Sequence, residues 1–538
     1  MNSLSRRTFL GQSGLAIGAL AAVASAADAP PSKPATKPAT WKTALKTLTF
    51  TGWNVYATRF VDPPTIAWNP IEGAAGYVVQ FAGERDESAR VVRIKSTTFA
   101  MKEHWPALAD GCVDLIAWAV DAKDDAICTA GSRRFWKCPD FDGVNQAALD
   151  WTGSVERVMA YLLAPARDEV REYEKGLPRC CWSCSEDSIT GRRRMLSFPA
   201  LHHPSFIFAY LDYAEAFPKS ASTAAALQQA RQYADWLLAN RLPADWKCGL
   251  FPFSTIEDGK TEGHVEGRNI TLFRAARVGE AMVAMYRRTS DEKYLAYARH
   301  LGDAYVAMQQ PDGSWPYRVD PKDGKVVEAY TSNAVTPARL LALLEGIEAN
   351  AKYKSAREKA IAWVMNNPVK TRRWQGMYED VGPAPPYRNL QHWDTNEMIR
   401  YLVEHQRDDA SAMRTAGELN RYIEDQFVVW QPSDRSVPEH CPTPTVLEQY
   451  TCYRPMESHT GVWILSLLAL HRATKNDAYL SKAIAAGNSI VRAQQPSGAY
   501  STWGFDTRFE RPFLTVDWPG CNAVALVGLL RLMQYGGA

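Results

Sequence analysis

The most regular feature of the sequence is a series of apolar segments of helical length that starts near residue 203 and continues to the end of the chain. Each segment follows a short polar cluster and is apolar nearly all round, which is typical of a helix buried on every side. The segments begin at His203, Asn269, Asn333, Asp394, Thr460 and Asn522, at intervals of 66, 64, 61, 66 and 62 residues. Such near-equal spacing indicates an internal repeat of one structural unit.

A second set of helices is predicted between the apolar ones. These segments carry Lys, Arg, Asp and Glu on one side and Ala, Leu and Tyr on the other, which is the pattern of a helix with one solvent-exposed face. They cover 222–240, 291–309, 354–366, 411–427 and 477–494, and 152–175 precedes the first apolar helix. The alternation of six outer and six inner helices predicts a mainly α fold, an (α/α)6 toroid, over residues 145–538.

The connections between these helices are of two lengths. An inner helix leads to its outer partner within a few residues, as at 217–220, whereas each outer helix reaches the next inner helix through roughly 20 to 30 residues, a length that is usually functional in a compact domain. All the long connections fall on the face where the inner helices begin. Helix N-termini on that face also offer free N–H groups to anions.

Two of the long connections share a short motif. Residues 309–315 and 494–500 both have the pattern Gln-x-x-x-Gly-x-aromatic after an outer helix. This element resembles the repeat of α/α-toroid enzymes, a group that includes terpene cyclases, glycosidases and polysaccharide lyases. Terpene cyclases fit poorly, because the acidic motif that they use for catalysis is not evident in this sequence.

Residues 45–140 have a different pattern. Segments such as 76–81 and 113–120 alternate or run as short strands, and Gly, Pro and Asp clusters separate them. This predicts a small all-β sandwich in front of the toroid. The run 64–79, with Trp68 and Tyr77, resembles a fibronectin type III module, in which such a Trp and Tyr lie on facing strands. The resemblance implies a role in packing or substrate presentation, since no catalytic cluster is present here.

The first 27 residues have the pattern of a twin-arginine export signal. An Arg-Arg pair at positions 6 and 7 precedes an apolar stretch, and the small residues 24–27 suit a signal peptidase. The stretch is too short to span a membrane, and no later apolar run reaches that length. We therefore expect a periplasmic or secreted mature protein with no membrane partner. Residues 28–44, rich in Pro, Ala, Lys and Thr, are predicted to be a linker.

Charge and cysteine content add further constraints. The net charge of +2 argues against nucleic acid as the main partner. Some of the ten cysteines of an exported protein could be paired, and Cys441 and Cys452 are the nearest plausible loop pair. The cluster 180–184 lacks the second Cys or His pair that a zinc site needs, so we expect no metal and no other cofactor. Cys521 lies in an apolar run and is expected to be a buried thiol.

Closure of the ring would bring the polar clusters at the starts of the inner helices into one basin. Hydrolysis of a glycosidic bond needs two carboxyl groups, or one carboxyl group and an activated water. The candidate catalytic residues are Asp394, Glu457, Glu266 and Glu379. Aromatic side chains in the same clusters would stack on sugar rings, and Arg268 could hold a substrate carboxylate through a bidentate pair. The candidate substrate-binding residues are Arg268, Asn269, His203, Asn333, Tyr387, His392, Trp393, Tyr450, His459 and Trp518.

Many of these candidates also have a structural interpretation. The segment 394–397 matches a capping box, in which Asp394 would accept backbone N–H groups. The residues Asn269, Asn333, Thr460 and Asn522 could likewise be plain N-caps. Glu266 and Arg268 could pair with each other, and His203 could serve packing. The sequence alone favours neither interpretation at the capping positions.

An exported toroid with a fibronectin-like front module resembles bacterial carbohydrate-active enzymes. In architecture and rim chemistry it is similar to exo-acting β-glucuronidases and unsaturated glucuronyl hydrolases. The resemblance implies a glycoside hydrolase that cleaves a uronic-acid-containing oligo- or polysaccharide by carboxylate general acid/base catalysis. One alternative is a polysaccharide lyase of the same fold, in which Asn269, Asn333 or Arg268 would neutralise the uronate and His459 or Tyr450 would transfer protons. The other is a non-catalytic glycan-binding protein, which the number of acidic groups at the rim disfavours.

Overall fold

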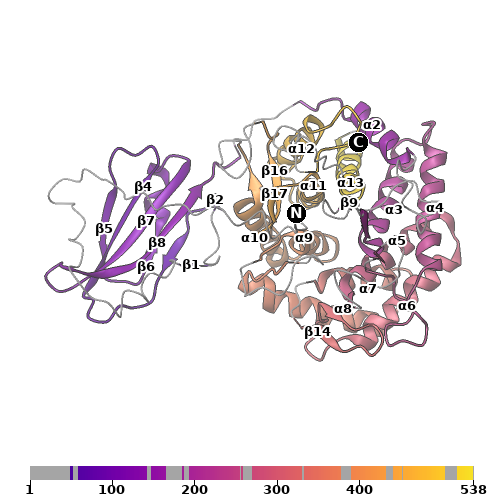
Figure 1. Ribbon diagram of the computed structural model, residues 1–538, viewed down its shortest axis with the longest axis horizontal. Helices are drawn as coiled ribbons and strands as arrows, with labels where there is room; N and C mark the ends of the chain where they lie inside the picture. The colour runs from indigo at the N-terminus through magenta and orange to yellow at the C-terminus, as the bar shows by residue number, and fades with distance from the viewer. Residues whose placement is uncertain are drawn as a thin grey trace. The chain divides into compact units, whose positions relative to one another are not determined.

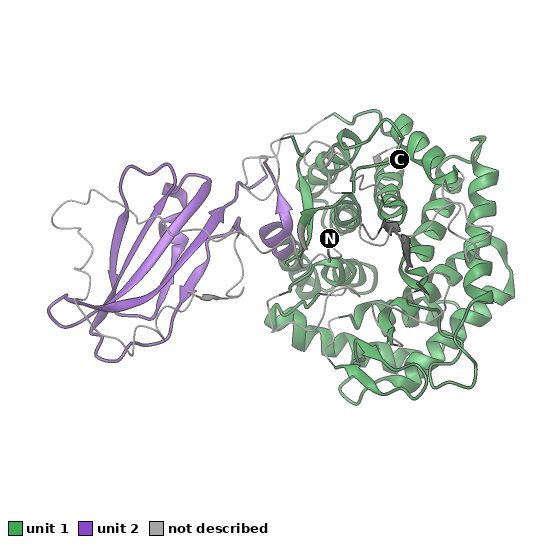
Figure 2. Cartoon of the chain, viewed as in Figure 1, with its two compact units in different colours: residues 1–4, 143–421, 436–538 green, residues 5–142, 422–435 purple. Residues whose placement is uncertain are grey.

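The chain forms two compact units, which are coloured separately in Figure 2. The helical unit comprises residues 143–421 and 436–538 together with 1–4, and the β unit comprises 5–142 and 422–435. The computed structural model describes residues 49–51, 59–141, 147–164, 184–186, 193–254, 256–257, 269–329, 333–376, 389–431, 440–450, 452–502 and 518–536. The predicted export signal and linker therefore lie outside the described residues.

The β unit is built from two sheets. One contains β1 (Thr49–Thr51), β3 (Thr65–Ala67) and β6 (Thr98–Ala100), in the order β1-β3-β6 and antiparallel throughout. The other has the order β2-β8-β7-β4-β5, from β2 (Arg59–Phe60), β8 (Ala126–Lys137), β7 (Gly111–Val120), β4 (Gly76–Gly83) and β5 (Arg90–Ile94). In this sheet only the β2–β8 pair is parallel among the described strands. Two short 3-10 helices, Met101–Glu103 and Trp105–Ala107, follow β6.

Side chains from both sheets share one apolar core. Ile66 and Phe99 of the first sheet pack with Val79 and Phe81 of the second. The rings of Trp68 and Tyr77 meet edge to face, with centroids 5.3 Å apart and an interplanar angle of 70°, as expected for an aromatic pair. The front unit is thus the small β-sandwich that the strand pattern predicts, while the finer likeness to a fibronectin type III module stays a prediction.

The described part of the helical unit contains six helices that the sequence places in an inner ring and six that it places outside (Figure 1). The inner helices are α3 (Pro199–Ala216), α5 (Leu272–Thr289), α7 (Val335–Glu345), α9 (Trp393–His405), α11 (Glu457–Thr474) and α13 (Pro519–Gly536). The outer helices are α2 (Trp151–Leu163), α4 (Thr223–Ala239), α6 (Glu292–Met308), α8 (Ala351–Val364), α10 (Ala410–Phe427) and α12 (Asp477–Arg492). From Tyr422 onward α10 is counted with the β unit. A π-helical turn, Met365–Val369, follows α8.

Contacts between helices close the ring. Each inner helix contacts the next, from α3 through α5, α7, α9 and α11 to α13, and α13 contacts α3 again. The first outer helix, α2, contacts both α12 and α13 from the other end of the chain. The fold is therefore the (α/α)6 toroid that the repeat spacing predicts. Among the described helices, none is long and apolar enough to cross a membrane.

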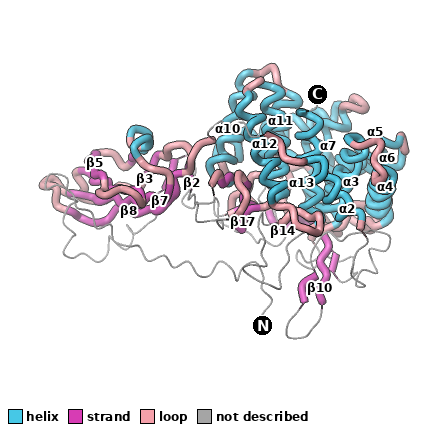
Figure 3. Tube along the Cα trace, turned by 90° about the horizontal axis from the view of Figure 1, so that it is seen from above, coloured by secondary structure: helices cyan, strands magenta, loops and turns pink. Residues whose placement is uncertain are grey.

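Short strands occupy the long connections that lead from outer to inner helices. They form a sheet of β9 (Cys184–Glu186), β10 (Arg193–Ser197) and β11 (Ile256–Glu257), and another of β12 (Ile270–Thr271), β13 (Arg318–Val319) and β14 (Val326–Glu328). A hairpin of β16 (Thr445–Gln449) and β17 (Cys452–Pro455) precedes α11, and β15 (Val428–Val429) follows α10. Figure 3 shows β10, β14 and β17 on one side of the helices, which is the face where the inner helices begin.

Candidate active site

Two of the predicted carboxylates lie at the N-terminal ends of neighbouring inner helices. Asp394 is the second residue of α9, and Glu457 is the first residue of α11. The two helices are in contact, and the two side chains are 0% and 2% exposed. Free backbone N–H groups and the helix dipole favour an anion at such a position. Both carboxylates thus lie in the buried first turn of an inner helix, on the face that bears the long connections.

Hydrogen bonds orient both carboxylates. Asp394 Oδ2 accepts from Gln391 Nε2 at 3.0 Å, and Gln391 Oε1 accepts from the Asp394 backbone N–H at 3.2 Å. Glu457 Oε1 accepts from Thr502 Oγ1 and from Asn522 Nδ2, each at 3.2 Å. These donors are neutral amides and a hydroxyl, and they hold each carboxylate in place. A catalytic carboxylate requires this kind of support from the residues around it.

A pair of histidines lies between the two helix ends. His392, at the N-cap of α9, and His459, in the first turn of α11, are joined by a contact of 2.8 Å between Nε2 and Nδ1. His392 Nε2 also lies 3.0 Å from the carbonyl oxygen of Leu447. Burial lowers the pKa of His392 to about 3, so this imidazole is neutral at neutral pH.

Asn396 sets the proton position on His392. Its Nδ2 donates to the His392 backbone carbonyl at 3.0 Å, which fixes the orientation of the amide, and the same NH2 group donates to His392 Nδ1 at 3.0 Å. His392 Nδ1 is therefore an acceptor, and the proton of the neutral ring is on Nε2. That proton points at Leu447 O and His459 Nδ1, so His459 Nδ1 must also accept. Neutral His459 consequently carries its proton on Nε2 and acts there as a hydrogen-bond donor.

We expect Asn396→Asp to reverse both tautomers. A carboxylate can only accept from His392 Nδ1 at this position, so the His392 proton moves to Nδ1 and His459 Nδ1 becomes the donor. Nitrogen-15 chemical shifts of histidine-labelled protein distinguish the two tautomers. The signal of His459 is identified as the one that is lost in His459→Gln. We expect protonation of His459 on Nε2 in the unmodified protein and on Nδ1 in the variant. An unchanged His459 signal in the variant would show that Asn396 does not control this pair.

Three other predicted binding residues lie around the same helix ends. The Trp393 and His459 rings meet at 5.6 Å and 76°. The Trp518 backbone N–H, just before α13, donates to Thr502 Oγ1 at 2.8 Å. The same hydroxyl donates to Glu457, so this bond fixes its position. The Tyr450 backbone N–H donates to Leu390 O at 3.0 Å, which joins the connection before α9 to the β16–β17 hairpin.

The remaining described candidates are farther along the ring. Asn333 is buried before α7, and Asn269 is half-buried before α5. The ring of His203 packs against Tyr233 and Trp236 of the outer helix α4, with centroids 4.9 and 4.7 Å away. This position fits the packing interpretation of His203 rather than contact with a ligand. Glu266, Glu379, Arg268 and Tyr387 lie outside the described residues.

The N-cap interpretation of the polar helix starts is wrong. The N-caps of α5, α7, α9 and α11 are Thr271, Ala334, His392 and Met456, and none of these four side chains makes a capping hydrogen bond. The predicted caps lie elsewhere: Asn269 and Asn333 precede the caps, and Asp394, Thr460 and Asn522 lie inside the first turns of α9, α11 and α13. The boundary of α11 differs because its buried first turn, 457–460, is polar, so the apolar pattern begins after the helix itself.

Three supporting residues were not predicted from the sequence. Gln391, Asn396 and Thr502 are each 0% exposed, and each bonds a predicted site residue. Gln391 and Asn396 flank Asp394 closely in sequence, so an amide-rich stretch around the start of a buried helix is a signal that could find them. Thr502 has no such signal, because only folding brings the residue after the 494–500 motif to Glu457.

The predicted Cys441–Cys452 disulfide is wrong, since Cys441 is a free, buried thiol. Cys441 precedes β16, whereas Cys452 pairs with Gln449 at the turn of the β16–β17 hairpin. Burial raises the pKa of Cys441 to about 12, which keeps it an unreactive thiol at neutral pH. Cys521 is a buried thiol, as predicted. Among the described residues, no group of three or more His, Cys, Asp or Glu side chains could hold a metal ion.

Buried histidines make the fold sensitive to acid. Burial lowers the pKa values of His202, His203 and His392 to about 3, whereas an unfolded histidine titrates near 6.5. The unfolded chain therefore binds these protons first, so stability is full above pH of about 6.5 and is lost as the pH falls toward 3. For each histidine the free energy of unfolding falls by at most about 1.4 kcal/mol per pH unit.

The expected check is His203→Phe, which keeps an aromatic ring against α4 and removes one proton-binding group. Urea unfolding between pH 4.5 and 7 should give a shallower pH dependence for the variant than for the unmodified protein. Other groups also titrate in this range, such as Asp212, whose pKa is raised by burial to about 6. Because they are present in both proteins, their contribution to the pH dependence cancels in the difference between the two curves. Parallel curves for the two proteins would show that His203 does not contribute.

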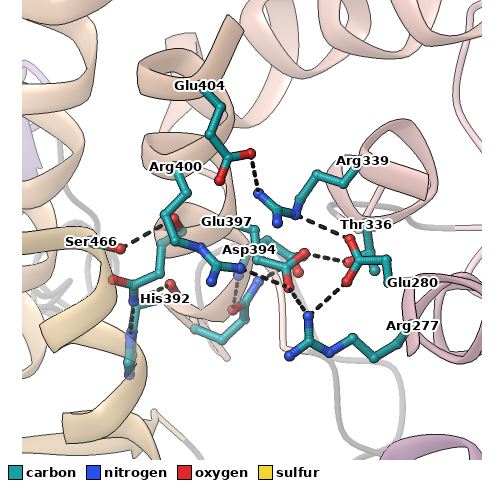
Figure 4. A network of polar contacts seen from close by, with 12 residues as sticks. Arg277, Glu280, Thr336, Arg339, His392, Asp394, Glu397, Arg400, Glu404 and Ser466 are labelled. Atoms are coloured by element: carbon teal, nitrogen blue, oxygen red, sulfur yellow. Dashed lines mark hydrogen bonds and ion pairs between the residues drawn. The ribbon is translucent and has the colours of Figure 1, made fainter. Parts of the chain in front are cut away.

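Beneath the first turns, an ion network joins α5, α7 and α9 (Figure 4). Arg277 Nη1 lies 2.7 Å from Glu280 Oε2, Arg339 Nε lies 3.1 Å from Glu280 Oε1, and Thr336 Oγ1 donates to Glu397 Oε2 at 2.6 Å. Burial opposes ionisation of Glu397, but the charges of Arg277 and Arg339 hold the pKa of its carboxyl below the ordinary value. Burial lowers the pKa of Arg400 to about 10, so it remains protonated at neutral pH.

Known proteins are similar to this chain in structure but not in sequence. No protein-family model matches the chain, and no curated protein sequence matches it. Among solved structures, cellobiose 2-epimerase from Bacillus thermoamylovorans B4167 is 11% identical over 71% of this chain and 99% of its own, with a TM-score of 0.50. This likeness shows a shared fold.

Two further structures are similar to this chain at lower TM-scores. A family 76 glycoside hydrolase from a bovine Bacteroides thetaiotaomicron strain is 11% identical over 91% of this chain and 99% of its own, with a TM-score of 0.49. An unsaturated glucuronyl hydrolase specific for heparin is 11% identical over 72% of this chain and 98% of its own, with a TM-score of 0.47.

Proposed function

We propose that this protein is an exported glycoside hydrolase that cleaves a uronic-acid-containing glycan, with Asp394 and Glu457 as its pair of catalytic carboxyl groups. The observation that carries the proposal is the placement of these two buried carboxylates at the starts of contacting inner helices. Glycoside hydrolysis requires such a pair, one group to protonate the leaving oxygen and the other to activate water or attack the sugar.

The surroundings of the two carboxylates support sugar binding. Trp393 and Trp518 stand at the starts of α9 and α13, where an aromatic face can stack on a sugar ring. His459 Nε2 would donate a hydrogen bond to a hydroxyl or glycosidic oxygen. Arg268 remains the proposed partner of the uronate carboxylate, and the twin-arginine signal remains the proposed route of export.

A polysaccharide lyase is the second candidate, because the histidine pair offers groups for proton transfer. Elimination needs a base that removes the proton at C5, and a histidine base needs an unprotonated nitrogen facing the substrate. In the Nε2–H tautomer of His459 the unprotonated Nδ1 is already occupied by the contact with His392 Nε2, and the low pKa of His392 makes its imidazole a weak base. Because both histidines are poorly suited to act as the base of an elimination, we prefer the hydrolase to the lyase.

The products separate the candidates. The full-length chain is incubated with saturated and 4,5-unsaturated uronate oligosaccharides, and reducing ends and near-ultraviolet absorbance are followed together. A hydrolase raises the number of reducing ends without a rise in absorbance. A rise in absorbance would replace this proposal with the lyase, an isomerised sugar without cleavage would replace it with an epimerase, and binding without product would leave a glycan-binding protein.

A further inference from the structure

A small cavity lies in the middle of the ring of inner helices, deeper than the candidate active site. Residues of α3, α5, α9, α11 and α13 line it, and its polar members are Ser205, Arg277, Glu397 and Arg400. The volume open to the centre of a water molecule is about 20 Å³. A space of this size holds one or two waters or one monatomic ion, and it is too small for a sugar.

Of the two arginines that line this cavity, Arg400 is poorly satisfied by the described part of the protein. Arg277 Nη1 and Arg400 Nη2 each lie 3.9 Å from the same atom, Glu397 Oε1, beyond hydrogen-bond distance. Arg277 has a close partner in Glu280, but Arg400 has no closer carboxylate among the described residues. The Nε of Arg400 is buried and has no hydrogen-bond partner in the described part of the chain. A buried charged donor without a partner is destabilising.

Charged groups surround the cavity. The guanidinium groups of Arg277, Arg339 and Arg400 are mostly buried here, together with the carboxylates of Glu280 and Glu397. Asp212 is a third buried carboxylate, and the charge of Arg277 acts on it. Of the three guanidinium groups, that of Arg400 has its nearest described carboxylate oxygen at 3.9 Å, beyond hydrogen-bond distance.

We propose that the cavity binds one small monovalent anion, such as chloride, between Arg277 and Arg400. The anion supplies a charged acceptor to the guanidinium groups, and hydrogen bonds between charged partners are stronger than those to a neutral water. Apolar neighbours such as Phe208 and Val524 suit a weakly hydrated halide. The site stabilises the ring by linking α5 to α9, and Trp393 of the candidate active site also lines the cavity.

The test is thermal unfolding of the full-length chain at constant ionic strength, with sodium chloride replacing sodium methanesulfonate, whose anion is too large for the cavity. We expect a saturable rise in Tm of about 2–5 °C, since a ligand of the folded state alone stabilises it. Arg400→Met should abolish the rise. The control Arg357→Met should keep it, because Arg357 pairs with Glu345 and Tyr401 and does not line the cavity.

Equal Tm values in the two salts, or an undiminished chloride response in Arg400→Met, would overturn the proposal. If Arg400→Met does not fold, crystals of the unmodified protein grown in sodium bromide decide the question. An anomalous difference peak between Arg277 and Arg400 supports the anion site. Density without anomalous signal in the cavity, as from water, contradicts it.

Discussion

Replacement of Asp394 by Asn should lower kcat on the cleaved glycan by about 10²–10⁴-fold, the range expected for loss of a general acid or base. The change keeps the shape of the side chain, and the amide can still bond Gln391, so the fold should be retained. Glu457→Gln should have a loss of similar size, because hydrolysis uses both groups. Steady-state kinetics and Tm are measured on the same preparations.

A matched control is available in Asp477→Asn. Asp477 also lies in the first turn of a helix, the outer helix α12, but it is 91% exposed. Both substitutions remove a negative charge from the N-terminal turn of a helix, so both lose the favourable interaction with the helix dipole. Only Asp394 lies in the candidate active site, so Asp477→Asn should leave kcat unchanged within about twofold. Normal activity of Asp394→Asn would reduce Asp394 to a structural residue and remove it from the proposed pair.

Gly528→Ala should lower the free energy of unfolding by about 1–3 kcal/mol, the usual cost of an added methyl group in a tightly packed core. A Cβ atom at Gly528 would lie 2.7 Å from both Cα and O of Gly461 on α11. These are backbone atoms, so α11 and α13 must move apart for the methyl group to fit. Since the two helices complete the ring, urea unfolding should show the loss as a lower midpoint with an unchanged slope.

Gly417→Ala is the control of opposite sign. At Gly417, in the outer helix α10, the nearest heavy atom to an added Cβ is Tyr479 Oη at 3.7 Å, an ordinary contact. Alanine is the better helix former by roughly 0.5–1 kcal/mol, so this variant should be more stable than the unmodified protein. Equal effects of Gly417→Ala and Gly528→Ala would show that the α11–α13 contact is less tight than described.

The repeat spacing was enough to predict the ring, because an inner helix must be apolar on every side and an outer helix on only one. The positions of the helix starts could not be predicted as well. α11 begins at Glu457 and α13 at Pro519, each three residues before the predicted start. The first turn of α11 is buried but polar, and α13 begins with Pro-Gly, so in neither helix does the apolar pattern mark the first residue.

The sequence also identified part of the candidate site. Asp394, Glu457, His392 and His459 were predicted together because they precede or begin apolar helices, and the structure brings them to neighbouring helix ends. The sequence does not predict the residues Gln391, Asn396 and Thr502 that orient them, since a hydrogen bond such as Thr502 to Glu457 joins residues 45 positions apart. His203 begins an apolar run and is therefore a candidate from the sequence, but periodicity does not tell which side of the helix faces the centre of the ring.

The central claim is that a glycan binds at the starts of α9 and α11. The most direct measurement is a crystal structure of Asp394→Asn soaked with the oligosaccharide that the unmodified protein cleaves. The account predicts a sugar with its scissile bond between residue 394 and Glu457, stacked on Trp393 or Trp518. An oligosaccharide bound only elsewhere, for instance on the β unit, would contradict it.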